Sequence, residues 1–384
     1  MSAPVLHASA SPSEWAAGLL SDAKVEALTQ HFKAAGFCCV GDVIPASALD
    51  AARERLDFDA AHQALGMKHK ERGPASGAGG HLQLGVPRCG PFVTAAIASN
   101  PIIEQLAVAL LGCPEGGVFM SFFNGNTNIP GSGTQLLHAD GGWYCQSEQE
   151  AAAAEEPWPL PTVDLVFNFS TDEIGPSDGP TELWPGTHID PSHLAGPVMT
   201  RGPPEEAAAE EAARRAAHGP PVANTLPRGA VSVRDFRLWH RGVPNTGSRP
   251  RHMLAISYSR RTSANKGVGL NGGGAGGLFR FGRSAAPAFD RAWWPSPARA
   301  ALAAGGPRGT VSHGCEFVDD ERIDHFGNLP LASPNRDGGG GDRGKYWRPA
   351  AAIAAQPDDA GVGSVAGWIA KAATRTSASR VAKL

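Results

Sequence analysis

The sequence lacks the features that mark secreted, membrane-spanning and polyanion-binding proteins. Its six cysteines form no Cys-x-x-Cys pair, and 384 residues are far more than a small disulfide scaffold contains. No apolar run reaches the length of a membrane span, and the N-terminus has no basic segment followed by an apolar one. The net charge of −3 argues against a general nucleic-acid binder. We therefore expect a soluble intracellular protein with reduced thiols and with no nucleic-acid or membrane partner.

Apolar and polar residues alternate in the middle of the chain, which predicts strands. One face of the stretch 163–170 carries Val163, Leu165, Phe167 and Phe169, and the other carries Asp164, Val166, Asn168 and Ser170. Short strands between glycine and proline turns favour a barrel or jelly roll. Helical spacing predicts helices over 22–35, 46–65 and 100–111. The expected class is mainly β with flanking helices (α+β).

Changes in composition divide the chain into three parts. We expect a flexible N-terminus over 1–21, a main folded domain over 22–262 and a partly ordered extension rich in Gly, Ala and Pro over 263–384. Within the domain, inserted helices are predicted near 146–157 and 203–218. The second contains Glu–Arg pairs at the four-residue spacing of a solvated helix.

The chain ends in Ala382-Lys383-Leu384, which differs by one small residue from the Ser-Lys-Leu peroxisomal signal. In so alanine-rich a chain, an accidental match is the alternative interpretation. The expected location is therefore cytoplasmic or peroxisomal.

Four polar residues in three separated segments suggest a metal centre. His138 and Asp140 are one residue apart, so on an extended strand both point to the same side while Ala139 points away. His240 follows a later strand-like segment and supplies a third ligand. Two histidines and a carboxylate bind a non-haem iron and leave positions open for oxygen and a co-substrate. Arg251, eleven positions after His240, indicates that the co-substrate is acidic.

Three motifs carry a resemblance to a known family: "FFNGNTNIPGSGTQLLHADGGW", "DGPTELWPGTHI" and "LWHRGVPNTGSRPRHMLAISY". Through them, residues 25–262 resemble the phytanoyl-CoA dioxygenase family of Fe(II)- and 2-oxoglutarate-dependent oxygenases. The resemblance implies a double-stranded β-helix (jelly-roll, cupin-like) core. It also implies a reaction that uses Fe(II), O2 and 2-oxoglutarate, with ascorbate as an accessory reductant, and that releases succinate and CO2.

The resemblance also assigns roles to single residues. His138, Asp140 and His240 are expected to hold the iron and to form the catalytic centre. Arg251 is expected to pair with the distal carboxylate of 2-oxoglutarate, because a guanidinium fork matches a carboxylate. Arg249 is the competing candidate, and the eleven-residue offset favours Arg251.

Further contacts with the co-substrate are implied for Gln135, Thr181 and Met120. Each has an ordinary structural alternative: a surface strand residue for Gln135, a turn hydroxyl for Thr181 and a core side chain for Met120. His188, in "WPGTH", is expected to be structural rather than a fourth ligand.

The acidic ligand and the arginines bear on the reaction and the substrate. Halogenating members of the family replace the carboxylate ligand by a small residue, so Asp140 favours hydroxylation. The expected substrate is a small molecule or an acyl-CoA, and no protein partner is evident. Five arginines are candidates for CoA phosphates, with solvated strand-end charges as the favoured alternative: Arg228, Arg234, Arg237, Arg241 and Arg260.

Two other functions compete with this interpretation. The same ligand set serves zinc hydrolases and cupin-like enzymes that use another metal, although a hydrolytic site has no use for Arg251. A non-catalytic jelly-roll protein that binds a small molecule or a partner is the second alternative. The intact ligand set argues against loss of activity.

Overall fold

The computed structural model describes residues 6–66, 80–82, 88, 90, 93–112, 118–141, 145, 147–190, 204–260, 279–303, 311–312 and 315–318. The helices are α1 (Pro12–Ala17), α2 (Asp22–Ala35), α3 (Ala46–Gly66), α5 (Ala95–Ala98), α6 (Pro101–Leu111), α7 (Glu148–Ala153), α8 (Pro204–His218) and α9 (Ser296–Ala303). The longer strands are β2 (Phe37–Gly41), β4 (Val118–Asn128), β5 (Asp164–Ser170), β8 (Val231–Asp235) and β10 (Arg251–Arg260). The shorter ones are β1 (Ala8–Ser9), β3 (His81–Leu82), β6 (Thr181–Leu183), β7 (Val222–Asn224), β9 (His240–Gly242), β11 (Phe279–Gly282), β12 (Val311–Ser312) and β13 (Cys315–Val318).

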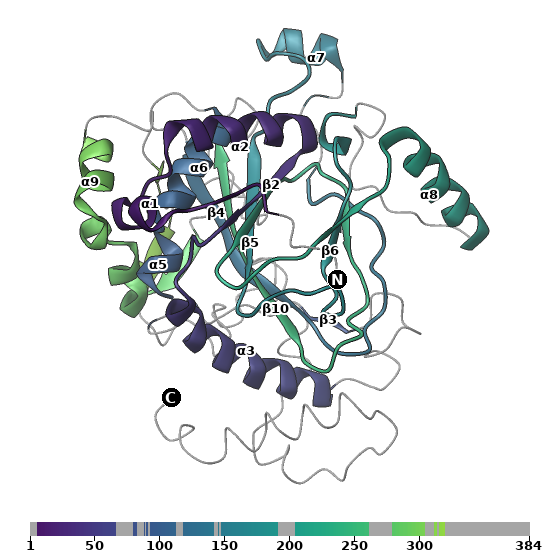
Figure 1. Ribbon diagram of the computed structural model, residues 1–384. Coiled ribbons are helices and arrows are strands. Elements are labelled where there is room, and N and C mark those ends of the chain that lie inside the picture. The colour runs from purple at the N-terminus through teal and green to yellow at the C-terminus, as the bar shows by residue number, and fades with distance from the viewer. Residues whose placement is uncertain are drawn as a thin grey trace.

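The strands form a jelly roll from two facing sheets (Figure 1). The large sheet has the order β1-β2-β8-β5-β10-β4-β12, and the small one has the order β7-β6-β9. A bridge between His138 and His240 adds the segment after β4 to the small sheet beside β9. From β4 to β10 the chain passes back and forth between the sheets, except that β6 and β7 follow each other within the small sheet, and β4 and β10 pair with each other. This is the connectivity of two Greek keys, so the predicted jelly-roll fold is confirmed.

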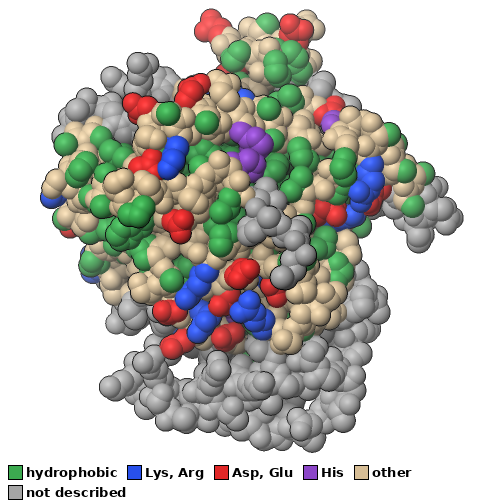
Figure 2. All heavy atoms as spheres, in the orientation of Figure 1, with side chains coloured by type: hydrophobic (Ala, Val, Ile, Leu, Met, Phe, Trp, Pro, Cys, Tyr) green, Lys and Arg blue, Asp and Glu red, His purple; other side chains and the backbone are tan. Residues whose placement is uncertain are grey.

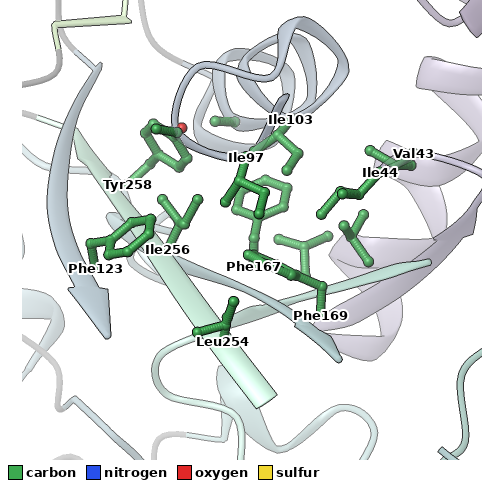
Figure 3. Packing of buried hydrophobic residues seen from close by; sticks show 14 of the residues in the cluster. Val43, Ile44, Ile97, Ile103, Phe123, Phe167, Phe169, Leu254, Ile256 and Tyr258 are labelled. Carbon is green, nitrogen blue, oxygen red and sulfur yellow. The ribbon is translucent and has the colours of Figure 1, made fainter. Parts of the chain in front are cut away.

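The main hydrophobic core lies between the large sheet and the helices that cover it. Leu165, Phe167 and Phe169 of β5 are buried in this core, as the alternation predicted. Figure 3 shows Phe167 pointing toward Ile97 and Ile103, which lies on α6. The opposite face of β5 is turned toward the space between the two sheets.

Local sequence explains where the two helices over this core begin and end. Asn100 accepts hydrogen bonds from the backbone N–H groups of the first turn of α6, and Pro101 starts the helix without losing a bond. Gly36 ends α2 with a positive φ of 82°. A Cβ on Gly36 would lie 2.6 Å from Nδ1 of His188, so only glycine fits at this contact.

Residues 8–17 differ from the flexible N-terminus expected over 1–21. Strand β1 pairs in parallel with β2, and Ser11 with Glu14 forms a capping box at the start of α1. A strand of two residues is too short to show a periodicity, and its pairing rests on backbone hydrogen bonds. No pattern in the sequence therefore indicates β1.

The predicted inserted helices correspond to α7 and α8. The Glu–Arg ion pairs of α8 form at the expected four-residue spacing. The helix is nevertheless more than a solvated surface element, because the guanidinium of Arg214 lies 5.0 Å from the ring centroid of Trp239 and that of Arg215 lies 5.3 Å from Trp184. These cation–π contacts fix α8 against the small sheet.

Part of the expected C-terminal extension packs on the domain. Phe281 and Phe289 join the main core, and β12 pairs with β4 at the edge of the large sheet. The Ala382-Lys383-Leu384 ending lies outside the described residues. In the described part of the chain, no helix combines the length and apolarity that crossing a membrane requires. Figure 2 shows acidic and basic side chains intermixed on the visible face, in line with the near-zero net charge.

Truncating the centre of the core tests this packing. Phe167 is fully buried, so we expect Phe167→Ala to lower the free energy of unfolding by about 3–5 kcal/mol. The exposed Gln30→Ala serves as the control and should change it by less than about 0.5 kcal/mol. Urea denaturation followed by circular dichroism measures both. Equal effects of the two variants would contradict the assigned core.

Candidate active site

The two sheets enclose a cavity of about 300 Å³. Strands β4, β5, β8 and β10 line one side of it, and the small sheet with the preceding segment lines the other. Six of the seven predicted site residues line this cavity: Gln135, His138, Asp140, Thr181, His240 and Arg251. Segments far apart in the chain therefore meet at one cavity.

The three predicted metal ligands lie together in the cavity. One ligand atom from each of His138, Asp140 and His240 lies within 4.8 Å of the others. Oδ1 of Asp140 is 3.8 Å from Nε2 of His138 and 3.5 Å from Nε2 of His240. The two imidazole centroids are 4.3 Å apart. This arrangement leaves one carboxylate oxygen and two ring nitrogens around a common point.

Backbone carbonyls orient both imidazoles. Nδ1 of His138 lies 2.8 Å from the carbonyl oxygen of Leu136, and Nδ1 of His240 lies 2.9 Å from that of Leu238. Since a carbonyl can only accept, each Nδ1 is the nitrogen that carries the hydrogen when the ring binds a metal. The lone pair is therefore on Nε2, which is the nitrogen that faces Asp140. Metal-binding histidines typically have this arrangement.

The backbone holds the ligands in register. The N–H of His138 donates to the carbonyl of His240 at 3.0 Å, and the N–H of His240 donates back at 2.8 Å. The N–H of Asp140 donates to the carbonyl of Phe236 at 2.9 Å. Ala139 points the opposite way, into a small apolar cluster behind the site. The predicted same-side placement of the two ligands rests on these bonds.

A buried ion pair supports the turn that carries Phe236. The Arg237 guanidinium donates to both carboxylate oxygens of Asp235, at 2.9 and 2.7 Å, and Thr162 donates to Asp235 at 2.7 Å. Burial acts to raise the pKa of Asp235, but the charge and hydrogen bonds of Arg237 outweigh it and lower the pKa. Fixing this turn fixes the carbonyl that anchors Asp140.

Arg234 of β8 controls the charge of the carboxylate ligand. Its Nη2 lies 2.5 Å from Oδ2 of Asp140, which leaves Oδ1 facing the histidines. Desolvation acts to raise the pKa of Asp140, but Arg234 and His240 hold it well below its usual range. Asp140 is therefore ionised at neutral pH, as a metal ligand must be.

His240 is held neutral by its surroundings. Burial lowers its pKa to about 4, and the positive charge of Arg234 acts in the same direction. A neutral imidazole offers its Nε2 lone pair without first losing a proton. The site is thus prepared for a cation at neutral pH.

Arg251 lies in the same cavity and points toward β6. Its Nε and Nη2 donate to the carbonyl of Gly179, at 3.2 and 3.0 Å. Burial lowers its pKa to about 10, so it is charged at neutral pH. No carboxylate pairs with it among the described residues. Arg249, the competing candidate, has a side chain that is 53% exposed and lies 3.8 Å from Asp172 outside the cavity.

A glycine is required beside Arg251. Gly179 has a φ of 67°, and a Cβ there would lie 2.2 Å from Nδ2 of the Asn128 side chain. The close approach brings the Gly179 carbonyl within reach of the guanidinium. The "DGPTE" segment of the sequence therefore shapes the arginine pocket as much as Thr181 does.

Gln135 and Thr181 line the cavity near Arg251. Oε1 of Gln135 accepts a hydrogen bond from the backbone N–H of Gly242 at 2.8 Å, which ties Gln135 to β9. Oγ1 of Thr181 contacts the sulfur of Met253 at 3.9 Å. Both occupy positions from which they can contact a ligand of Arg251.

Met120 does not line the cavity and is a correction to the predicted set. It is 1% exposed and packs in the main core. The register between β4 and β10 shifts at a bulge between Ser257 and Tyr258, and Met120 lies opposite Tyr258 on the core side. Cross-strand partners share a face, so Met120 follows Tyr258 away from the cavity.

The other notable histidines lie outside the ligand set. His188 packs against Phe32, with ring centroids 6.4 Å apart, in agreement with the structural role expected for it. His252 points away from Arg251, where its ring nitrogens lie 2.9 Å from Oγ1 of Thr127 and 3.0 Å from the carboxylate of Asp57.

Of the five arginines considered for CoA phosphates, Arg234 alone lines the cavity. The others pair with carboxylates: Arg228 with Asp50, Arg237 with Asp235, Arg241 with Glu182 and Glu211, and Arg260 with Glu156. Arg234 is thus a site residue that was predicted only as a candidate for CoA phosphates. The alternation along β8 could have indicated this position, because Val231 and Val233 face the core and Arg234 therefore lies on the opposite side of the strand.

The donor set fits iron. Two imidazole nitrogens and one carboxylate oxygen on one side of a cavity match the two-histidine, one-carboxylate set that binds non-haem iron. The wall of the same cavity also carries the positively charged side chains of Arg251 and Arg234.

Comparison with known proteins agrees with this chemistry. The sequence model of the family described as "Phytanoyl-CoA dioxygenase (PhyH)" matches residues 32–253. The structure of the epimerase SnoN in complex with Fe3+, alpha ketoglutarate and nogalamycin RO is 16% identical and has a TM-score of 0.39. The match covers 62% of this chain and 85% of that one.

Removing one ligand tests the metal centre. His138 is partly exposed, so His138→Ala should fold, and we expect its affinity for Mn(II), a stand-in for Fe(II), to fall at least ~10-fold. Isothermal titration calorimetry measures it. The control is His31→Ala, on α2 outside the cavity, which should bind as the wild type does. Equal loss in the two variants would contradict the assignment.

Proposed function

The chain belongs to the phytanoyl-CoA dioxygenase family, and we propose that it is an Fe(II)- and 2-oxoglutarate-dependent dioxygenase that hydroxylates a small molecule. The observation that carries the proposal is one cavity that holds both a possible three-ligand iron set and the guanidinium of Arg251, which pairs with no carboxylate among the described residues. Zinc hydrolases use the same ligands but need no such arginine. The arginine therefore favours an oxygenase over a hydrolase.

The protein side chains bind and orient. Nε2 of His138, Nε2 of His240 and Oδ1 of Asp140 would hold the iron, which together with O2 and 2-oxoglutarate supplies the oxidising chemistry and yields succinate and CO2. Arg251 would bind the distal carboxylate of 2-oxoglutarate in a buried setting, where a charge-assisted hydrogen bond is strong. Arg234 keeps Asp140 ionised and fixed.

Hydroxylation is the proposed outcome because Asp140 is present. Among family members, a halogenating site replaces this carboxylate by a small residue. Here Asp140 is held by Arg234 on one oxygen and by its backbone N–H on Phe236. The position is therefore filled by a fixed ligand rather than opened for a halide.

A small substrate is favoured over an acyl-CoA. The arginines that pair with carboxylates have their charge compensated and are poor candidates for CoA phosphates. The cavity of about 300 Å³ suits a small metabolite beside the co-substrate. Ascorbate would serve as a reductant that maintains Fe(II).

Turnover of the co-substrate tests the proposal. The Fe(II)-loaded protein should convert 2-oxoglutarate to succinate in an O2-dependent manner, and His138→Ala should reduce the rate at least ~100-fold, because the iron set is incomplete. Succinate is quantified by mass spectrometry, with Zn(II) in place of Fe(II) as the metal control. Succinate formation that survives His138→Ala would refute the iron assignment. Absence of turnover together with absence of 2-oxoglutarate binding would favour a non-catalytic binding protein.

Two matched variants test whether Arg251 or Arg249 binds 2-oxoglutarate. Arg251→Gln should weaken 2-oxoglutarate binding to the Mn(II)-loaded protein by ~30-fold or more, since losing one partner of a buried charge pair costs about 2–5 kcal/mol. Arg249→Gln, two positions away and exposed, should leave the affinity unchanged. Calorimetric titration of both variants measures it. A larger effect at Arg249 would reverse the assignment.

A further inference from the structure

Arg234 has more hydrogen-bonding capacity than Asp140 uses. Its side chain is 7% exposed, and one of its nitrogens bonds to Asp140. Its Nε and Nη1 are buried without a hydrogen-bond partner among the described residues. Because a buried guanidinium N–H without a partner is costly, such groups in a cavity wall indicate a missing ligand atom.

A second unpaired polar group lies in the same row of the cavity wall. Val166 of β5 is the cross-strand partner of both Arg234 on β8 and Ser257 on β10. All three side chains line the cavity, and Oγ of Ser257 is also buried without a partner among the described residues. The row thus presents a cation, an apolar side chain and a hydroxyl in sequence. Such a surface matches an organic molecule with a charged end.

The charges of the cavity leave one positive charge uncompensated. Arg234 and Arg251 are opposed by Asp140 alone among the charged residues in the lining. A divalent metal and the doubly charged 2-oxoglutarate cancel each other, so the loaded site retains the same excess. A substrate with one negative charge would neutralise it.

Resting on the proposed function, we propose that Arg234 recognises a carboxylate of the organic substrate, which is therefore a small acid rather than a neutral molecule or a thioester. An oxygen of that carboxylate accepts from the free N–H groups of Arg234, and the carbon chain lies along Val166 toward Ser257. Arg234 touches both Asp140 and the substrate, so it places the acid next to the metal ligand.

A matched pair of probes tests this recognition. Hexanoate and hexanamide have the same chain and differ in charge, and their affinities are compared on the protein saturated with Mn(II) and 2-oxoglutarate. Relaxation enhancement of the probe protons by Mn(II) measures binding close to the metal. We expect hexanoate to bind the wild type at least ~10-fold more tightly than hexanamide. Arg234→Gln should reduce this ratio to about twofold or less, Arg234→Lys should retain part of it, and Arg249→Gln should leave it unchanged.

Several outcomes would overturn the proposal: no binding of hexanoate to the wild type, no preference for the acid, or a preference that survives Arg234→Gln. A loss of 2-oxoglutarate affinity in Arg234→Gln as large as that in Arg251→Gln would also overturn it, because Arg234 would then serve the co-substrate. Failure of the wild type to bind 2-oxoglutarate would instead refute the proposed function. In that case the hexanoate-to-hexanamide ratio on the protein without 2-oxoglutarate still decides the role of Arg234.

Discussion

The reciprocal backbone hydrogen bonds between His138 and His240 are the constraint on which the site depends. They join the segment after β4 to β9, and they complete the small sheet of the jelly roll. The same two bonds place two imidazoles side by side, with their Nδ1 atoms turned to the backbone and their Nε2 atoms turned to the cavity. Fold and ligand geometry are thus one feature, because the sheet cannot form in this register without assembling the metal ligands.

The second constraint is the charge of a buried space. Two guanidinium groups in the cavity wall have one carboxylate between them, and desolvation makes every unpaired charge expensive. Arg234 keeps Asp140 ionised, and Arg251 rests on the neutral carbonyl of Gly179. The lining of the cavity therefore carries one more positive than negative charge, and the proposed acidic co-substrate and acidic substrate would supply the negative charge. Affinity for anions is expected from this imbalance.

Patterns that depend on local spacing could be predicted from the sequence. The alternation of residues 163–170 identified both faces of β5, and the His-x-Asp spacing identified two ligands on one side of a strand. Features that depend on the pairing of strands could not be predicted. The bulge that turns Met120 toward the core has no signature in the sequence around Met120, and β1 is too short to show a periodicity. Arg234 was predictable in principle from its phase on β8. Its partner Asp140 lies 94 positions away, so the ion pair was not.

The central claim is that one cavity binds both the metal and 2-oxoglutarate. A crystal structure of the protein with Mn(II) and 2-oxoglutarate, grown without oxygen, tests it most directly. The account predicts a metal bound by Nε2 of His138, Nε2 of His240 and Oδ1 of Asp140, with the distal carboxylate of 2-oxoglutarate on Arg251. A metal held by other residues, or a co-substrate whose distal carboxylate lies away from Arg251, would contradict it.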